Sequence, residues 1–585
     1  MEHRREIDGL RAIAVVPVVL SHSNFSIFRG GFVGVDIFFV ISGFLITGII
    51  IEELDKGRFS LARFYERRAR RILPALFVVL LASIPFTWLW MLPDTLENFG
   101  QSVVATLLFA NNILLAKTSG YWDLEAEFKP LLHTWSLGVE EQYYLLFPLL
   151  MLILWRWGRK PALVAITVVL VASLISCEIS RRYHPAANFY LTTSRAWELL
   201  FGSLCAFAGF HLGRKHNEVL SAFGMILIAI AIFGYDSDVP YPSIFTLVPV
   251  VGTGLVLLFA RQGTVACRIL SLSPLVGIGL ISYSVYLWHQ PLIALARTYS
   301  PDPPSAAAMS MLVTATFVLS WLTWKYVETP FRDRSITPIR TVSVGLATVA
   351  TVLIAAGLGA HLTHGFPARF FKGVDARELF IAYNESVFRF KVDEFPDDGR
   401  RNVLVMGDST GRDFVNMIEE AGRRKDYNLV YRDDYECSGN APPTPTLSRL
   451  FNRADVFILV YLAENCAARL TADIGNENAS KVIVVGPKHF GYNLNPFLRT
   501  PLEERASARV KLMRFTLDEN DIQRSTLPAG SKFVDLIRLV GDGATMPVFD
   551  ENGLFLSQDR VHLTKQGAIY FSKRVFSDPA LSTLN

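Results

Sequence analysis

Long apolar segments fill the first 360 residues of this chain and restrict what it can fold into. A helix needs about 20 residues to cross the apolar part of a bilayer, where the backbone must satisfy its own hydrogen bonds. Twelve segments approach or reach that length, at 12–28, 32–51, 72–92, 100–116, 137–155, 162–179, 196–210, 220–233, 244–260, 275–296, 306–324 and 342–360. This part of the chain therefore predicts a multi-pass α-helical membrane bundle.

The overall composition agrees with an integral membrane protein, because 51% of the 585 residues are hydrophobic and only 19% are charged. The formal net charge of +4 is small for this length and is spread over short loops, which gives no indication of a nucleic-acid partner. The five cysteines show no metal-ligand spacing, so we expect no metal. The first apolar segment lacks a small-residue cleavage site, so we expect it to be retained.

Basic residues in the short loops set the expected orientation, because such loops stay in the cytoplasm. Arg4, Arg5 and the basic run at 56–71 place the N-terminus and the next short loop on that side. If segment 100–116 crossed the membrane, most later basic loops would lie outside. We therefore predict that it is re-entrant or lies along the outer surface, that about eleven helices cross, and that the chain after Gly365 is extracytoplasmic.

After Gly365 the sequence changes to an alternation typical of an α/β domain. Apolar runs at 402–406, 456–461 and 482–486 predict buried strands. Helical stretches are expected from Arg412 to about Lys425 and from Arg505 onward, including Met513. Strands that alternate with helices favour a parallel sheet covered on both faces. Segment 365–400 is either a linker or an extension packed on this domain.

Arg11 and His22 are the first candidates for function, because both lie in or beside the first apolar segment. An ionisable side chain at membrane depth is costly unless it faces a cavity, protein or a partner. Alternatively, Arg11 reaches the headgroups and His22 hydrogen-bonds a neighbouring helix. We favour a functional site, since nearly every later segment also brings a polar group to that depth.

A dense arginine motif, RFYERRARRILP, occupies 63–74. It can serve simply as a topology signal or an anchor to anionic lipid. Arg68 and Arg71 are three residues apart, however, so on a helix they share a face. Because arginine forks bind phosphates, the pair is a candidate site for a nucleotide-bearing acyl donor.

Two further polar clusters occur at membrane boundaries. Glu140 and Glu141 lie at the start of a predicted helix, where the helix dipole alone favours acidic groups. Later, ISYSVYLWHQP places His289 in an apolar helix, and Glu328 follows the next one. Considered alone, His289 is more simply interpreted as a packing histidine.

The polar C-terminal part carries residues typical of a serine nucleophile site. The strand at 402–406 leads into Gly407-Asp408-Ser409, where a strand-to-helix turn exposes the serine to backbone N–H groups that stabilise an oxyanion. Downstream, Asp559 and His562 have a spacing that lets a carboxylate orient a histidine while the histidine takes the serine proton. GDS alone also fits an Asx turn with a helix cap. The combination favours catalysis.

Seven motifs, in order, resemble the acyltransferase-3 family of membrane O-acyltransferases: RAIAVVPVVLSH, GGFVGVDIFFVISGFLIT, FYERRARRILPA, HTWSLGVEEQYYLLFP, SRAWELLFGSLCA, ISYSVYLWHQP and YVETPFR. The resemblance covers residues 1 to about 335 and implies transfer of an acyl group, usually acetyl from acetyl-CoA, to a carbohydrate. It implies that His22 is the catalytic base or acyl acceptor. The implied donor-binding residues are Arg11, Arg68, Arg71 and Glu328, to which we add Glu140.

GDS and DRVHL together resemble the SGNH hydrolase superfamily over about 400–580, an arrangement known behind acyltransferase-3 bundles. The resemblance implies Ser409, Gly439 and Asn465 as oxyanion donors, although the chain reads YLAENCA where the family has GxND. The predicted organisation is a membrane domain at 1–335, an additional transmembrane helix at 336–364, the linker or extension at 365–400, and the SGNH-like domain at 401–585.

Cys437 and Cys466 are a disulfide candidate, because both lie in the polar C-terminal third. In an oxidising compartment the two cysteines could pair. Cys177, Cys205 and Cys267 lie in or beside apolar segments instead.

These observations predict an O-acetyltransferase of a bacterial inner membrane. It would move acetyl from cytoplasmic acetyl-CoA, with no permanently bound cofactor, to hydroxyls of an envelope polysaccharide or lipid-linked oligosaccharide. O-antigen, exopolysaccharide and peptidoglycan are all open as acceptors, and acetyl can reach Ser409 directly or through a carrier. Two alternatives are a transporter of acyl groups or lipid-linked sugars with a binding domain, and an extracytoplasmic O-acetyl esterase that uses the same triad.

Overall fold

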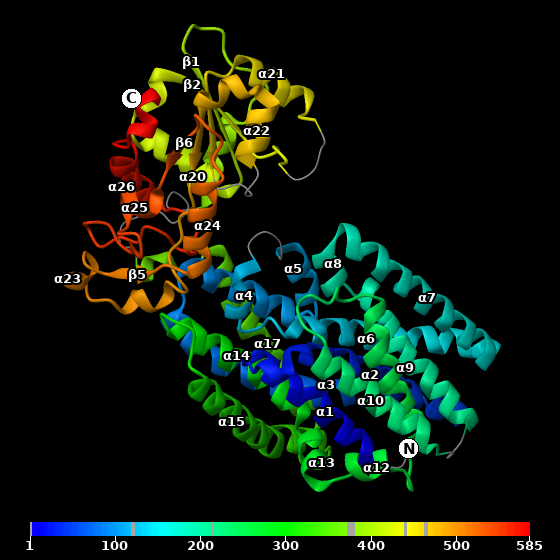
Figure 1. The fold of residues 1–585 in the computed structure, drawn as a ribbon. Helices are drawn as coiled ribbons and strands as arrows, with labels where there is room; N and C mark the ends of the chain where they lie inside the picture. The colour runs from blue at the N-terminus through cyan, green and yellow to red at the C-terminus, as the bar shows by residue number, and fades with distance from the viewer. Residues whose placement is uncertain are drawn as a thin grey trace. The chain divides into compact units, whose positions relative to one another are not determined.

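A computed structural model describes residues 3–118, 123–212, 216–370, 381–437, 442–460 and 466–584. The chain divides into two compact units (Figure 1). The helical unit comprises Met1–Leu89, Glu97–Arg297 and Pro304–His361. The α/β unit comprises Leu362–Asn585 with two short segments, Trp90–Leu96 and Thr298–Pro303.

The helical unit is built from a series of α-helices, several of them long. They are α1 (Arg5–His22), α2 (Gly34–Asp55), α3 (Leu61–Trp90), α4 (Pro93–Leu107), α5 (Asn111–Thr118), α6 (Thr134–Leu154), α7 (Arg159–Tyr183), α8 (Pro185–Tyr190), α9 (Thr192–Leu212), α10 (Glu218–Gly234), α11 (Leu247–Phe259), α12 (Val265–Leu270), α13 (Ser273–Leu280), α14 (Ser282–Tyr299), α15 (Ala306–Thr323), α16 (Thr329–Arg332) and α17 (Ile339–Leu362). The arginine motif thus lies within one continuous helix, α3.

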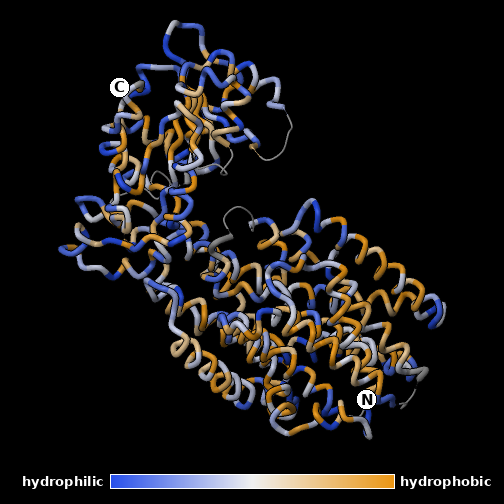
Figure 2. Tube along the Cα trace, viewed as in Figure 1, coloured by the Kyte–Doolittle hydropathy of each residue, from blue (hydrophilic) through white to orange (hydrophobic). Residues whose placement is uncertain are grey.

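Six helical stretches among the described residues are long and apolar enough to cross a membrane. They are Ser26–Asp55, Leu61–Trp90, Thr134–Trp157, Arg159–Tyr183, Ala306–Arg332 and Ile339–Leu362. Apolar side chains stay exposed on such helices, and Figure 2 shows the apolar colour running along them. On α7 these side chains recur every three or four residues at Val164, Val168, Val171, Ile175 and Ile179. A stripe of that kind without a protein partner suits lipid.

Several expected segments are interrupted in the structure. Segment 12–28 stops being α-helical at His22, and a 3₁₀ stretch, Ser26–Val33, follows. Segment 275–296 divides into α13 and α14 at Ile281. Segment 100–116 is broken between α4 and α5, where Phe109 has a positive φ of 52°. The predicted number of about eleven crossings stays a prediction.

Close helix contacts in this unit depend on glycine. A Cβ atom on Gly43 of α2 would lie 1.8 Å from the carbonyl oxygen of Leu199 on α9. A Cβ on Gly202 of α9 would lie 2.1 Å from the carbonyl oxygen of Val40. Small residues let the two backbones approach, which is the usual basis of helix pairing where the hydrophobic effect is absent.

The α/β unit contains a five-stranded sheet in the order β2-β1-β3-β4-β6. The strands are β1 (Arg401–Gly407), β2 (Tyr427–Arg432), β3 (Val456–Val460), β4 (Val482–Val485) and β6 (Lys532–Val534). All four pairings are parallel, as predicted from the alternation of strands and helices. Figure 2 shows the apolar colour concentrated on this sheet.

Helices cover both faces of the sheet. Along β1, Val403 and Val405 pack in one core with side chains from α20 (Ser409–Glu420) and α26 (Lys565–Val575). Leu404 and Met406 point to the other core, formed with α21 (Pro445–Arg453) and α22 (Cys466–Ile474). Because neighbouring residues of a strand face opposite sides, one buried apolar run serves both cores.

Two sequence expectations for this unit are settled by the structure. The helix expected from Arg505 onward begins later than predicted. Arg509–Lys511 forms strand β5, antiparallel to β7 (Thr545–Pro547), and helix α24 (Arg514–Ser525) starts after Met513. Val510 is buried between two exposed residues, which is a strand pattern with period two. The described part of 365–400 packs on the domain, since Val387 belongs to its core.

Candidate active sites

A basic cavity of about 170 Å³ lies within the helical unit. Three predicted donor-binding arginines line it together, Arg11 from α1 and Arg68 and Arg71 from α3. Glu140, in the second turn of α6, lines the same cavity. The rest of the lining is largely apolar and aromatic: Val35, Phe38, Phe39, Ile41, Ser42, Leu45, Ile46, Ile49, Ile72, Ser136, Leu137, Tyr144, Ser282, Tyr283 and Tyr286.

The charges that line the basic cavity are unbalanced. Glu140 accepts hydrogen bonds from Ser42 and Tyr144 and is the one carboxylate among the lining residues. Arg11 contacts Asp8 at 3.2 Å, and the Arg68 guanidinium lies 5.1 Å from the ring centre of Tyr144. Arg71 forms no hydrogen bond or ion pair within the described part of the chain. The surplus of guanidinium groups favours an anionic ligand.

His22 does not line the basic cavity but lies behind one of its walls. Its Nδ1 is 3.1 Å from Nε2 of His289, and the two rings are stacked. His289 belongs to the same turn of α14 as Tyr286, whose hydroxyl lies 2.6 Å from that of Ser136 in the lining. The structure therefore separates the predicted essential pair, with Arg11 in the cavity and His22 in a histidine cluster next to it.

Glu328 also lies outside the cavity lining. It ends a π-helical turn, Trp324–Glu328, a conformation that is frequent at functional sites. Its carboxylate accepts a hydrogen bond from Ser284 and pairs with Arg332 at 2.7 Å. Ser284 lies between Tyr283 and Tyr286 on α14, and both of these tyrosines line the cavity. Glu328 therefore supports the α14 wall of the cavity and is not part of its lining.

A buried charge network in the helical unit was missed by the sequence analysis. Arg195 of α9 pairs with Asp36 of α2 at 2.8 Å and with Glu198 at 3.2 Å, and all three side chains are 1% exposed or less. Tyr241 donates a further hydrogen bond to Asp36. Both Asp36 and Arg195 occur in the motifs that carry the family resemblance, so the signal was present, but their pairing spans 159 residues.

In the α/β unit, Ser409 is the first residue of α20, directly after β1. Asp408 caps this helix by accepting the N–H of Thr410 at 2.8 Å. The hydroxyl of Tyr431, on the neighbouring strand, donates to the carbonyl of Asp408 at 2.8 Å. These contacts fix the turn, so the predicted nucleophile lies at the carboxyl end of the sheet, the usual site edge of a parallel sheet.

Asp559 and His562 form the predicted pair. Nδ1 of His562 lies 2.5 Å from Oδ2 of Asp559, whose other oxygen accepts the backbone N–H groups of Val561 and His562. Burial raises the pKa of Asp559, but the charge of His562 and these hydrogen bonds outweigh it and hold the pKa at about 2. Asp559 thus stays ionised at neutral pH and keeps the proton on Nδ1 of His562.

No hydrogen bond joins Ser409 to His562 in this structure. Oγ of Ser409 is buried and makes no hydrogen bond with any described residue. Catalytic hydrogen bonds commonly tighten only when substrate is bound. The other two oxyanion candidates, Gly439 and Asn465, lie outside the described residues.

A second buried ion pair, also missed by the sequence analysis, joins the loop that carries His562 to α20, the helix that begins at Ser409. Asp413, one turn after Ser409, accepts the N–H of Leu563, the residue after His562, at 3.1 Å. Lys488 Nζ lies 2.6 Å from the Asp413 carboxylate and donates to the carbonyl of Val561, also at 2.6 Å. Burial raises the pKa of Asp413, and the Lys488 charge opposes that rise.

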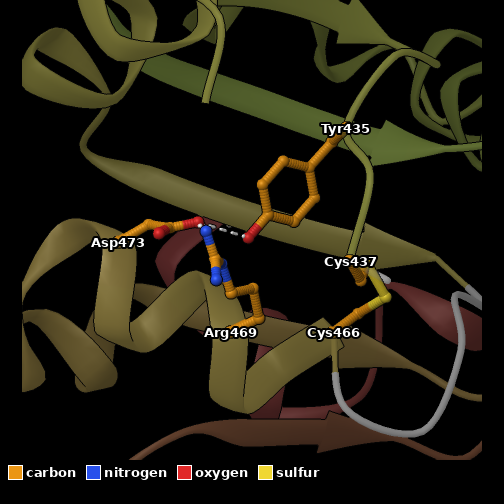
Figure 3. Close-up of a disulfide and its surroundings, with 5 residues drawn as sticks. All are labelled: Tyr435, Cys437, Cys466, Arg469 and Asp473. Carbon is orange, nitrogen blue, oxygen red and sulfur yellow. Dashed lines mark hydrogen bonds and ion pairs between the residues drawn. A yellow bond between two sulfur atoms is a disulfide. The ribbon is translucent and has the colours of Figure 1, made fainter. Parts of the chain in front are cut away.

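Cys437 and Cys466 are joined by a disulfide (Figure 3). The bond connects the chain that follows β2 to the first residue of α22. Close by, Tyr435 donates to Asp473 at 2.9 Å, and Arg469 pairs with the same carboxylate at 3.2 Å. The disulfide and these polar contacts thus join the chain after β2 to α22.

A membrane-type helical unit with a basic cavity, on one chain with an α/β unit that carries a serine, histidine and aspartate set, has the organisation of a two-module membrane acyltransferase. A family model described as an acyltransferase domain, that of acyltransferase family 3, matches residues 4–325. That match covers more than half of the chain, and the chain belongs to this family.

Curated relatives carry names that agree with this family. The chain is 33% identical to the peptidoglycan O-acetyltransferase OatA of Listeria monocytogenes over 344 residues, 56% of this chain and 55% of the relative. It is 28% identical to the O-acetyltransferase OatA of Staphylococcus aureus over 382 residues, 60% of this chain and 62% of the relative. The chain therefore matches only 55 to 62% of their lengths. No solved structure matches it.

Replacing Lys488 by Met should destabilise the α/β unit, because it leaves the Asp413 carboxylate buried without its cation. Removing one partner of a buried pair costs about 3–5 kcal/mol. A second change, Asp413→Asn, should recover much of that loss, since an amide oxygen still accepts the Leu563 N–H. Resistance of the α/β unit to protease during heating measures the effect. A Lys488→Met protein as resistant as the exposed control Lys511→Met would contradict the account.

Proposed function

We propose that this protein is an O-acetyltransferase that takes acetyl from acetyl-CoA and delivers it to hydroxyl groups of a cell-envelope glycan. The observation that carries the proposal is the presence in one chain of the basic cavity and of an α/β unit that holds Ser409 and the Asp559–His562 pair. The first suits a phosphate-bearing acyl donor and the second suits an acyl-enzyme. A transporter with a binding domain would need no nucleophile with an oriented base.

The basic cavity supplies complementary chemistry for acetyl-CoA. Arg68 and Arg71, on one face of α3, are suited to the phosphates of the donor. The apolar part of the lining, which includes Leu45 and Ile46, suits the acyl arm. His22 is the base that activates the hydroxyl accepting the acyl group.

At the second site, Ser409 forms and then releases an acetyl ester. Oγ attacks the acetyl carbonyl, its proton passes to Nε2 of His562, and the leaving group takes that proton as its bond to the carbonyl breaks. A sugar hydroxyl then attacks the ester, gives its proton to His562, and Oγ of Ser409 recovers the proton as the product leaves. Asp559 stays ionised throughout and stabilises the imidazolium.

The names of the relatives and the charge distribution support a choice of acceptor and location. Relatives are named for O-acetylation, one of them of peptidoglycan, so peptidoglycan is the first acceptor to test. The basic run at 56–71 favours a cytoplasmic N-terminus in a bacterial inner membrane, with the α/β unit on the opposite side.

Replacing Ser409 by Ala should abolish glycan acetylation and leave donor binding intact, because the variant loses the nucleophile but not the basic cavity. Ester-linked acetate in envelope glycan measures the first effect and equilibrium binding of acetyl-CoA the second. Ser525→Ala, an exposed serine of α24, is the control. Full acetylation in Ser409→Ala would contradict the role of the serine, and faster acetate release than transfer by the wild type would favour an esterase.

Replacing Arg71 by Gln should raise the KM for acetyl-CoA at least about tenfold, since a charge-assisted contact to phosphate is worth about 1.5–3 kcal/mol. Thiol release from acetyl-CoA in membrane vesicles measures it. Arg63→Gln, an exposed arginine of the same motif, should leave KM unchanged. Equal KM values for the two variants would remove the basic cavity as the donor site.

A further inference from the structure

His289 contacts His22 through a directed hydrogen bond and not through ring packing alone. Its side chain is fully buried, and its Nδ1 lies 2.6 Å from the backbone carbonyl oxygen of Tyr286. Its Nε2 is the atom that faces Nδ1 of His22 at 3.1 Å. Both ring nitrogens of His289 therefore have hydrogen-bond partners, and one of these partners is the predicted base His22.

The carbonyl of Tyr286 determines where the protons of both rings lie. A carbonyl oxygen only accepts hydrogen bonds, so Nδ1 of His289 must carry a hydrogen. In a neutral imidazole the second nitrogen is then an acceptor. Nδ1 of His22 must therefore donate to Nε2 of His289, and the lone pair of the neutral His22 ring lies on its Nε2. That nitrogen makes no hydrogen bond within the described part of the chain.

We propose that His289 is a positioning residue that fixes the tautomer of His22, so that Nε2 of His22 is the proton acceptor of the membrane site. The proposal rests on the proposed function. The accepting hydroxyl attacks the thioester carbonyl, and its proton moves to Nε2 of His22. As the C–S bond breaks, the departing thiolate takes that proton, and His22 returns to its neutral form. His289 stays neutral and accepts a stronger hydrogen bond while His22 is charged.

The charged neighbours of the pair have fixed positions. Arg297 donates to the backbone carbonyl of His22 at 3.0 Å and itself pairs with Glu127 at 3.3 Å. His133, just before α6, lies edge-on to His289 with ring centres 5.4 Å apart. Within the described residues, no carboxylate contacts either imidazole. The Tyr286 carbonyl and His289 thus take the place that the carboxylate of Asp559 has beside His562.

Two substitutions of similar size separate this role from packing. His289→Gln keeps an amide oxygen near the position of Nε2 that can accept from Nδ1 of His22, whereas His289→Leu fills the space without an acceptor. We expect His289→Leu to lower kcat for thiol release from acetyl-CoA by about 10- to 100-fold at unchanged KM, the size of a misplaced general base. We expect His289→Gln to retain activity within about tenfold of the wild type.

The pH profile of kcat gives a readout that loss of packing would not change. In His289→Leu the acidic limb should move to lower pH, because the His22 imidazolium has lost its acceptor, whereas in His289→Gln it should stay near the wild-type position. Gln290→Leu is the matched control, because it removes the buried hydrogen bond of the next residue to the carbonyl of Lys129 and leaves the histidine pair intact. This control should keep the wild-type limb.

The outcomes separate this inference from the function on which it rests. Equal kcat values and equal acidic limbs for the Gln and Leu variants would overturn the positioning role, as would a change confined to KM. Absence of acetyl-CoA-dependent thiol release in the wild-type protein would instead overturn the proposed function. A Leu variant that fails to accumulate in the membrane leaves the Gln variant as the test. Wild-type pH dependence in that variant supports the role, and a displaced acidic limb contradicts it.

Discussion

A guanidinium group inside an apolar helical bundle is stable only where opposite charge or hydrogen-bond acceptors surround it, and this constraint sorts the buried arginines of the helical unit. Arg195 has Asp36 and Glu198, and Arg70 has Glu66 together with two carbonyl groups. These arginines are satisfied by the protein and hold helices together. Arg68 and Arg71, on the same helix as Arg70, line a cavity instead, and Arg71 makes no hydrogen bond or ion pair with a described residue. Under the proposed function, an anionic group of the acyl donor supplies the missing partner.

Both candidate sites use the same device for a histidine base. In the α/β unit the carboxylate of Asp559 holds Nδ1 of His562, and in the helical unit His289 holds Nδ1 of His22. In each arrangement Nε2 of the histidine is left as the proton acceptor of the proposed reaction. A neutral partner stabilises an imidazolium less than a carboxylate does, but it avoids placing an additional ion among apolar helices, where desolvation is expensive. The difference between the two partners thus follows the two environments.

The sequence predicts those parts of the molecule that depend on local pattern. The apolar segments predicted the helical unit, the motif at 63–74 placed Arg68 and Arg71 on one helix face, and the strand-turn-helix at Ser409 is present. Patterns do not show which distant residues meet. Asp36 meets Arg195 and Asp413 meets Lys488 only in the folded chain, so both networks were missed. Segment 509–511 was assigned to a helix because a three-residue strand carries too little periodicity to be recognised.

The central claim is that acetyl from the donor at the basic cavity reaches Ser409. Mass spectrometry of the peptide containing Ser409, from wild-type vesicles supplied with isotope-labelled acetyl-CoA on the cytoplasmic side and no glycan acceptor, measures this directly, because the ester then has no sugar hydroxyl to which it can pass. The account predicts labelled acetyl on Ser409, and none when His22 is replaced by Ala. Labelled acetyl transferred to glycan once acceptor is added, without labelled Ser409 before or during turnover, would contradict it.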